Sequence, residues 1–346
     1  MDDETAWLPA RLEPVALRLA RADQAEFKIG ELALEWSRHP LDCAQVDNGA
    51  AGIDLVVNGI RPIPPLLSML FSEAIHHLRA AIENTLFHLV SASRGEELPE
   101  AHARAIEMPI YEDPSDLEKW LKVRTRRGVD ELGAESTLGQ RIARLQPYTD
   151  PASVQSHSPA LGALTGVEPE AAHPMLLLQK YSNEDKHRAI RMAAVRTLVQ
   201  NWAEPFFTSD RSMRPVEVGD VVATMKPGVA APIETTSAVH VQRPESSTWV
   251  SPITELDQLH RHVADTVIPT LVTGAALTRS VPPNIDLTDT GQETSERIRS
   301  GSWEPARQRL DKIRAAALYE AIAHPPRIPP VRGRSDVAEV PPEAVE

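Results

Sequence analysis

Apolar residues recur at three- and four-residue steps over several long stretches, the spacing that places them on one face of an α-helix. The clearest stretch is 66–94, and the same spacing predicts helices over 14–38 and 174–199. Shorter helices are predicted over 114–122, 136–145 and 253–272. The stripe of the clearest helix consists of Leu67, Phe71, Ile75, Leu78, Ile82, Leu86 and Leu89.

Strands are predicted in two parts of the chain. Two β-compatible runs, 43–46 and 53–57, flank Asp47-Asn48-Gly49, a polar break typical of a hairpin. Prolines separate further β-compatible stretches between about 200 and 250, and residues 147–174 carry the turn residues of a long connection. We therefore expect a mainly α (α+β) fold, a long-helix bundle with a small antiparallel β-sheet.

The pattern also predicts where domains end. Residues 1–278 form the helical core with the sheet at about 200–250, and residues 279–323 form a charged helical appendage behind a Pro- and Thr-containing link. Residues 324–346 are rich in Pro and change from basic to acidic, so we expect a flexible, disordered tail. Whether a protein partner binds this tail is left open.

The formal net charge is −13 at pH 7. Non-specific coating of nucleic acid needs clustered Lys and Arg that displace counterions from phosphates, so this charge argues against it, although a local basic groove is left open. The single cysteine, Cys43, suits a reducing compartment. The N-terminus lacks a secretory signal, and no apolar run reaches the roughly 20 residues that span a bilayer. We expect a cytoplasmic protein without a membrane partner.

Polar residues line two edges of the predicted helix 66–94. On a helical wheel, Glu73, His76, Arg79 and Glu83 lie behind the apolar stripe, and His77, Asn84 and His88 lie along one flank. Solvated helix faces favour Lys, Glu and Arg, so this concentration of histidine points to a binding face. The alternative is a solvated face whose histidines make ordinary hydrogen bonds.

On the predicted helix 174–199, the polar residue Asp185 lies on the side of the apolar stripe, so we expect its carboxylate to point inward. A buried carboxylate needs a cation, and the candidates are Lys186, Arg188 and Arg79. The two helices should therefore meet at this point. Whether such a pair carries chemistry or only fixes the helix register is left open.

A metal site is the alternative interpretation. Glu73 and His76 on one helix, and Glu184 and His187 on the other, are each spaced three residues apart, the pairing of di-iron carboxylate bundles. Such a site would bind a divalent transition metal and would need further carboxylates. Glu26, Glu31 and Glu35 could supply them, but nothing in the sequence selects among these three.

A basic run containing an aromatic residue, 119–127, could follow a phosphate backbone, although a solvated loop is the commoner explanation. No glycine-rich phosphate loop, Gly-x-Ser-x-Gly elbow or His-Glu-x-x-His helix is present in the sequence. The sequence therefore matches none of the familiar enzyme motifs.

Three segments together resemble a broad family of bacterial helical proteins with motifs close to HNLRxALDHL, LQPY and NxDKHR. They are residues 73–84, Leu145-Gln146-Pro147-Tyr148 and Asn183-Glu184-Asp185-Lys186-His187-Arg188. The resemblance covers about residues 15–275 and implies no activity.

The Arg-x4-His pattern of that family is in turn similar to HEPN domains, many of which are metal-independent ribonucleases of toxin and phage-defence systems. The resemblance implies that Arg79 would stabilise a phosphate in a site shared across a homodimer. The histidine position holds Asn84, which cannot act as general base or acid, so the chain departs from the pattern at a catalytic position.

We therefore predict a HEPN-like helical protein, linked to RNA or nucleotide binding or to phage defence, that is active or catalytically degenerate. Its polar centre would hold Arg79, Asn84, Asp185, Lys186, His187 and Arg188, without a cofactor. The alternatives are a metal-dependent enzyme built on the Glu-x-x-His pairs of two helices and a non-catalytic binding scaffold. Whether the chain is an enzyme is left open.

Overall fold

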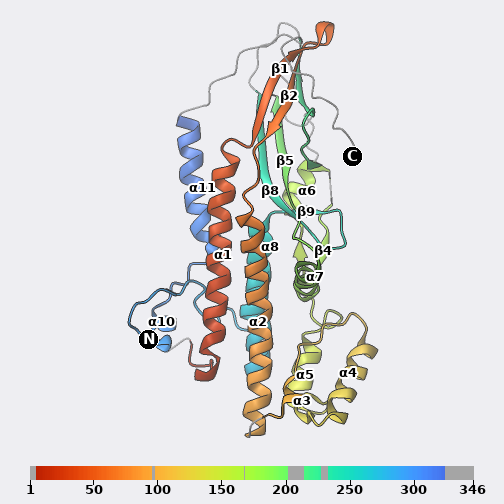
Figure 1. The fold of residues 1–346 in the computed structure, drawn as a ribbon, viewed down its shortest axis with the longest axis vertical. Coiled ribbons are helices and arrows are strands. Elements are labelled where there is room, and N and C mark those ends of the chain that lie inside the picture. Colours follow the sequence, from red (N-terminus) through yellow and green to blue (C-terminus); the bar gives the residue numbers. More distant parts are fainter. Residues whose placement is uncertain (1–4, 96–97, 167, 202–213, 227–232, 324–346) are drawn as a thin grey trace, which may run out of the picture.

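Long helices run along an elongated body, with β-strands at one end and short helices at the other (Figure 1). The structure is a computed structural model, and it describes residues 5–95, 98–166, 168–201, 214–226 and 233–323. The predicted mainly α architecture with small antiparallel sheets is confirmed. No helix among the described residues is both long and apolar enough to cross a lipid bilayer.

Helices α1 (Glu13–Ser37) and α2 (Leu66–Arg94) pack side by side and are joined by a hairpin of β1 (Leu41–Asp47) and β2 (Ile53–Ile60). The predicted helices over 14–38 and 66–94 and the predicted hairpin between them are confirmed. The apolar stripe of α2 is buried from Leu67 through Leu86, because the stripe faces α1 and the helices behind it. Gly52 has a positive φ of 116° and ends the turn before β2, a conformation that suits glycine.

A third long helix packs against α1 and α2, and its middle part is π-helical. It consists of α8 (Pro252–Arg261), a π-helical stretch, η4 (His262–Val267), and α9 (Ile268–Thr273). Pro269 has no N–H to donate to the carbonyl of Asp265, which accepts instead from the backbone of Leu277 at 2.8 Å. The resulting π-turn is the kind of helix irregularity that often occurs at functional sites.

The helix predicted over 174–199 is shorter than expected. Helix α7 ends at His187, and residues 192–201 form strand β5 (Met192–Asn201). Strand β5 pairs with β8 (Ile233–Gln242) from Met192 opposite Val241 to Asn201 opposite Ile233. This prediction was wrong because an apolar run of this length fits either structure, and pairing with a strand some 40 residues later decided the outcome.

The remaining strands and short helices fill the two ends. One sheet has the order β1-β2-β7, with β7 at Val221–Met225. A second has the order β6-β5-β8-β9, with β6 at Arg214–Pro215 and β9 at Trp249–Val250. The long connection contains β3 (Val154–Gln155), α6 (Pro159–Thr165) and β4 (Ala171–Ala172), and β3 and β4 form a third sheet. The short helices at the opposite end are α3 (Glu100–Ala103), α4 (Pro114–Arg126) and α5 (Thr137–Arg144).

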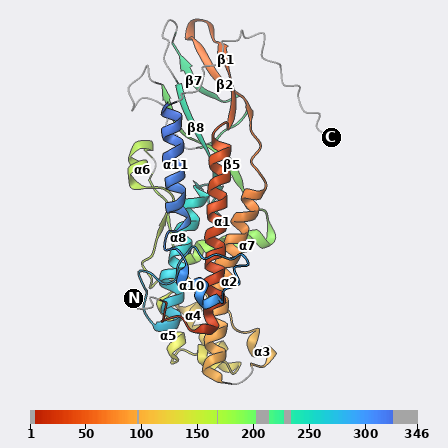
Figure 2. The same ribbon diagram turned by 90° about the vertical axis from the view of Figure 1, so that its left-hand side faces the viewer.

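The segment expected to be a helical appendage packs on the core. It contains α10 (Thr294–Ser300) and α11 (Ala306–Ala323), and α11 lies along α1 (Figure 2). Ile285, Ile298 and Leu310 belong to the same hydrophobic core as the long helices. The expected boundary after residue 278 therefore does not coincide with a break in the core. The expected tail, 324–346, lies outside the described residues.

Candidate functional site

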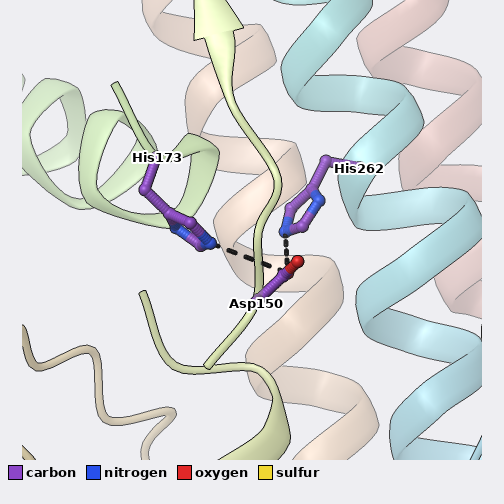
Figure 3. Close-up of side chains that lie close together, drawn as sticks. All are labelled: Asp150, His173 and His262. Atoms are coloured by element: carbon purple, nitrogen blue, oxygen red, sulfur yellow. Dashed lines mark ion pairs between the residues drawn. The ribbon is translucent and has the colours of Figure 1, made fainter. Parts of the chain in front are cut away.

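Three side chains from separate elements converge beside the π-helical stretch (Figure 3). Asp150 lies in the loop after α5, His173 is the residue before the first turn of α7, and His262 is the first residue of η4. The Nε2 atoms of both histidines lie 3.6 Å from Oδ2 of Asp150. Among the described residues, this is the one group of three or more His, Cys, Asp or Glu whose ligand atoms all lie within 4.8 Å of one another.

Local sequence fixes each of the three side chains. Oδ1 of Asp150 accepts the backbone N–H of Ala152 at 3.0 Å, which leaves Oδ2 facing the histidines. Nδ1 of His173 accepts the backbone N–H of Met175 at 3.2 Å and so caps α7, which Pro174 begins. His262 is held by the helix that contains it. One oxygen and two ring nitrogens are thus aimed at one point.

The three converging atoms are buried and lack hydrogen-bond partners. The side chains of His173 and His262 are each 7% exposed, and that of Asp150 is 11% exposed. Oδ2 of Asp150 and both Nε2 atoms make no hydrogen bond, since 3.6 Å is beyond hydrogen-bond length. Burial without a partner costs free energy, so the group is suited to a ligand that would complete it.

The electrostatics of the cluster favour the protonation states that bind metals. Burial by itself raises the pKa of Asp150, but His173, the N–H of Ala152 and His262 together hold that pKa below its ordinary value. Burial lowers the pKa of His262 to about 4, against a smaller opposing effect of Asp150. At neutral pH the site therefore offers a carboxylate and a neutral imidazole, the forms that coordinate metal ions.

The spacing of the three atoms also fits a metal ion. Zinc binds His nitrogen and carboxylate oxygen at about 2.0–2.2 Å, which places tetrahedral ligands roughly 3.3–3.6 Å apart. The two distances of 3.6 Å are at the upper end of this range. Two histidines and one carboxylate are a ligand set used for catalytic zinc and for non-haem iron.

One contact opposes metal binding. Because Nδ1 of His173 accepts the N–H of Met175, the proton of the neutral ring lies on Nε2, the atom that faces Asp150. A metal at Nε2 would move this proton to Nδ1 and break the contact with Met175. The cost is that of one capping hydrogen bond, about 1 kcal/mol, which is small beside the free energy of binding a transition metal.

The cluster adjoins a pocket of about 620 Å³ that lies between the connection 152–159, α8 and α11. His262 contributes to its wall, as does Pro174, the neighbour of His173. The volume is that of a site for a small-molecule ligand. His262 therefore belongs both to the cluster and to the wall of a space that can admit a small molecule.

The residues expected to form the polar centre lie elsewhere. Asp185 is exposed and accepts a hydrogen bond from Oγ of Ser72, so the prediction that it points inward was wrong. Lys186, His187 and Arg188 are also exposed. The prediction that α2 and α7 meet near Asp185 is confirmed, although a hydroxyl takes the place of the expected cation.

Arg79 is engaged within its own helix. Its guanidinium lies 2.6 Å from Glu83 and donates to the carbonyl of Met108 at 2.9 Å. Glu83 also accepts the backbone N–H of Met108 at 2.9 Å, so the pair anchors the segment around residue 108 to α2. Asn84 is exposed on the other side. These contacts give Arg79 and Glu83 a packing role, and the HEPN-like interpretation stays a prediction.

The two predicted Glu-x-x-His pairs do not form a joint site among the described residues. Glu73 lies 2.6 Å from Arg21 and 3.7 Å from His77, while His76 and His187 are exposed and Glu184 is half-buried. Of the three further carboxylates, Glu26 is buried beside Asp23 and Asp257, Glu31 pairs with Lys28, and Glu35 pairs with Arg38.

The basic run 119–127 is partly neutralised by neighbouring acids. Arg124 is buried, pairs with Glu107 and stacks at 4.5 Å over the ring of Trp120. Lys119 pairs with Asp116, and Lys122 with Glu118. Most of the run therefore lies on a helix, α4, and not in the solvated loop of the commoner explanation.

The converging cluster was missed at the level of sequence, because its members are separated by 23 and 89 residues and share no motif. One indication was present: the LQPY segment ends two residues before Asp150. Within it, Gln146 is fully buried, accepts the N–H of Tyr111 at 2.9 Å and donates to the carbonyl of Pro109 at 3.0 Å. The motif therefore holds the loop that presents Asp150.

Comparisons of the chain with protein-family models, with curated proteins and with solved structures find no match. Fold and site together describe a mainly helical protein with a buried Asp-His-His cluster beside an open pocket.

Proposed function

We propose that this chain is a metal-dependent enzyme in which Asp150, His173 and His262 bind one divalent transition-metal ion. The observation that carries the proposal is the convergence of three buried ligand atoms, none of which has a hydrogen-bond partner. A purely structural cluster would be expected to bring these atoms within hydrogen-bond length of one another or of the backbone, whereas both imidazole–carboxylate contacts are 3.6 Å long.

A three-ligand site beside a pocket corresponds to catalytic rather than structural metal sites. Structural zinc sites use four protein ligands, whereas catalytic sites use three and keep a position open. A bound ion of this kind supplies Lewis acidity and lowers the pKa of a coordinated water, so hydrolysis is the reaction class that we infer. Asp150 would offset part of the metal's charge, and His262, which also lines the pocket, would connect the ion to it.

The proposal keeps the predicted metal-dependent alternative but moves it to other residues. Glu73, His76, Glu184 and His187 are replaced by Asp150, His173 and His262. The RNA- or nucleotide-linked HEPN-like role is a separate proposal that the contacts of Arg79 do not favour, since Nη2 of its guanidinium contacts Glu83 and Met108 and Nη1 is buried. The homodimer and the protein partner for residues 324–346 stay predictions, and metal binding by the cluster requires neither.

Metal content tests the proposal directly. The purified full chain is analysed by plasma mass spectrometry and titrated with Zn²⁺ and Fe²⁺ by calorimetry, beside His262→Ala and Asp150→Asn. We expect close to one ion per chain in the wild type and loss of tight binding in both variants. The matched control is His240→Ala, because His240 lines the same pocket but does not belong to the cluster.

A second control, His187→Ala, separates the two metal hypotheses, because His187 belongs only to the Glu-x-x-His set. Retention of metal in His187→Ala and His240→Ala, with loss in His262→Ala, is the expected result. Absence of stoichiometric metal from the wild type after titration would contradict the proposal, as would equal binding by the wild type and His262→Ala.

A further inference from the structure

The charge of the pocket beside the cluster points to the kind of ligand it takes. Its lining includes two arginines, Arg261 of α8 and Arg307 of α11, and no Asp or Glu among the described residues. The chain as a whole carries a formal net charge of −13. A cationic lining on a strongly acidic protein concentrates the field at one place and selects anions.

The two arginines are available to a ligand although both also contact Asp257. Their side chains are 57% and 40% exposed, whereas that of Asp257 is 3% exposed and lies behind them. Two guanidinium groups share one carboxylate, so the rim keeps about one unit of positive charge. Guanidinium groups bind carboxylates and phosphates through paired hydrogen bonds, which makes an oxyanion the fitting ligand.

Hydroxyl groups add donors from other directions. Ser251 lines the pocket at the start of α8, where its Oγ accepts the N–H of Thr254 and keeps its own proton to donate. Ser158 does the same for Leu161 in the connection that forms the opposite wall. Donors from three separate elements suit a tetrahedral anion better than a planar one.

We infer that this pocket binds the phosphate group of a small phosphorylated compound. The inference deepens the proposed function, because it names the substrate class of the same site, but the phosphate contacts come from residues outside the metal cluster. Phosphate binding can therefore be measured without metal. The volume of about 620 Å³ leaves room for a compound of nucleotide size rather than for a folded nucleic acid.

The test uses the full chain, as purified and after dialysis against a chelator, titrated with inorganic phosphate and followed by calorimetry and ³¹P NMR. Acetate at equal ionic strength is the planar control. We expect saturable phosphate binding by the wild type and by His262→Ala, weakened about 10-fold or more in Arg307→Gln. Arg314→Gln, an exposed arginine of the same helix that does not line the pocket, should bind as the wild type does.

Two further variants keep the test decisive if Arg307→Gln fails to fold. Gln258 lines the pocket and its side chain donates only to the carbonyl of Thr254 one turn earlier. Gln258→Glu should weaken phosphate binding and Gln258→Lys should strengthen it, each with little change in shape. No saturable binding by the wild type, preference for acetate, or equal affinity across the charge series would overturn the inference. Phosphate binding without stoichiometric metal would refute the proposed function alone.

Discussion

Arg307 and Asp257, fifty residues apart, form an ion pair that ties α11 to the wall of the pocket. The guanidinium of Arg307 lies 3.2 Å from Oδ2 of Asp257, and Arg261 contacts the same oxygen from one turn along α8. The carboxylate is nearly inaccessible, while both arginines are partly exposed. One buried acceptor therefore holds two cations, and each can stand in for the other.

This sharing predicts strongly non-additive effects on stability. Arg307→Ala should lower the free energy of unfolding by about 1 kcal/mol, because the side chain is partly exposed and Arg261 remains to pair with Asp257. The double variant Arg261→Ala/Arg307→Ala should cost about 3 kcal/mol or more, because it leaves a buried carboxylate without a partner. Urea unfolding of both single variants and the double variant measures the coupling. Simple additivity of the two single costs would contradict the shared-acceptor account.

A contact between α1 and α11 predicts a substitution effect that is opposite in sign to the usual one. Exchange of Gly for Ala inside a helix normally stabilises by about 1 kcal/mol. At Gly30, however, an added methyl group would overlap the side chain of Leu310. We expect Gly30→Ala to destabilise the protein, since α11 must then move from α1.

The matched background is Leu310→Ala, which removes the obstructing side chain. In that background Gly30→Ala should become neutral or stabilising, although Leu310→Ala itself costs about 2–5 kcal/mol as a large-to-small core change. Thermal or urea unfolding of the four proteins completes the cycle. Equal effects of Gly30→Ala in both backgrounds would show that α11 does not pack on α1 at this point.

The sequence predicted those elements whose stability is local. Helices α1 and α2 and the first hairpin could be located because a long apolar stripe or a polar turn determines each of them within one stretch of chain. Strand β5 could not, since Met192–Asn201 became a strand only through pairing with β8. The same lack of long-range information led to the expectation that α11 was an appendage, when Leu310 packs into the core.

The candidate site was beyond prediction for a related reason. A metal motif is recognisable in sequence when its ligands share one helix or loop, as in the Glu-x-x-His pairs. Here each ligand comes from a different element, and His173 and His262 are set by a helix cap and a π-turn. The inward position of Asp185 was predicted from an apolar stripe on a helix running to residue 199. Because α7 ends at His187, the part of that stripe beyond residue 187 does not exist.

The ionisation of Asp23 should make the stability of the folded protein depend on pH. Burial raises its pKa from 3.8 to about 7, opposed by Arg309 and by the N–H of Ala306, and Asp257 raises it further. Because the folded-state pKa lies above the unfolded one, this contribution to stability is complete below pH 4. It is lost as the pH rises to about 7, by an amount on the order of a few kcal/mol.

Comparison with Asp23→Asn isolates this effect from other titrating groups, including neighbouring Glu26, whose pKa burial also raises. The amide oxygen can still accept the N–H of Ala306 but has no charge to desolvate. Between pH 5 and pH 8 we expect the wild type to lose more stability than Asp23→Asn in urea unfolding. Parallel curves for the two proteins would show that Asp23 ionises normally in the folded state.

The double role of His173 allows its metal-binding and structural functions to be separated. Its Nδ1 caps α7, and its Nε2 faces Asp150. Asn is among the best residues for capping a helix, because its side-chain oxygen accepts the same backbone N–H. We therefore expect His173→Asn to keep the metal-free stability within about 1 kcal/mol while removing one metal ligand.

Thermal unfolding with and without Zn²⁺ measures the difference. A metal that binds only the folded state stabilises the wild type by about 2.7 kcal/mol at a free concentration one hundred times its dissociation constant. We expect this gain to disappear in His173→Asn and to persist in His76→Asn, an exposed histidine on α2 outside the cluster. If both variants keep the full gain, the ion binds elsewhere, and Asp150, His173 and His262 are only an electrostatic contact between the loop, α7 and η4.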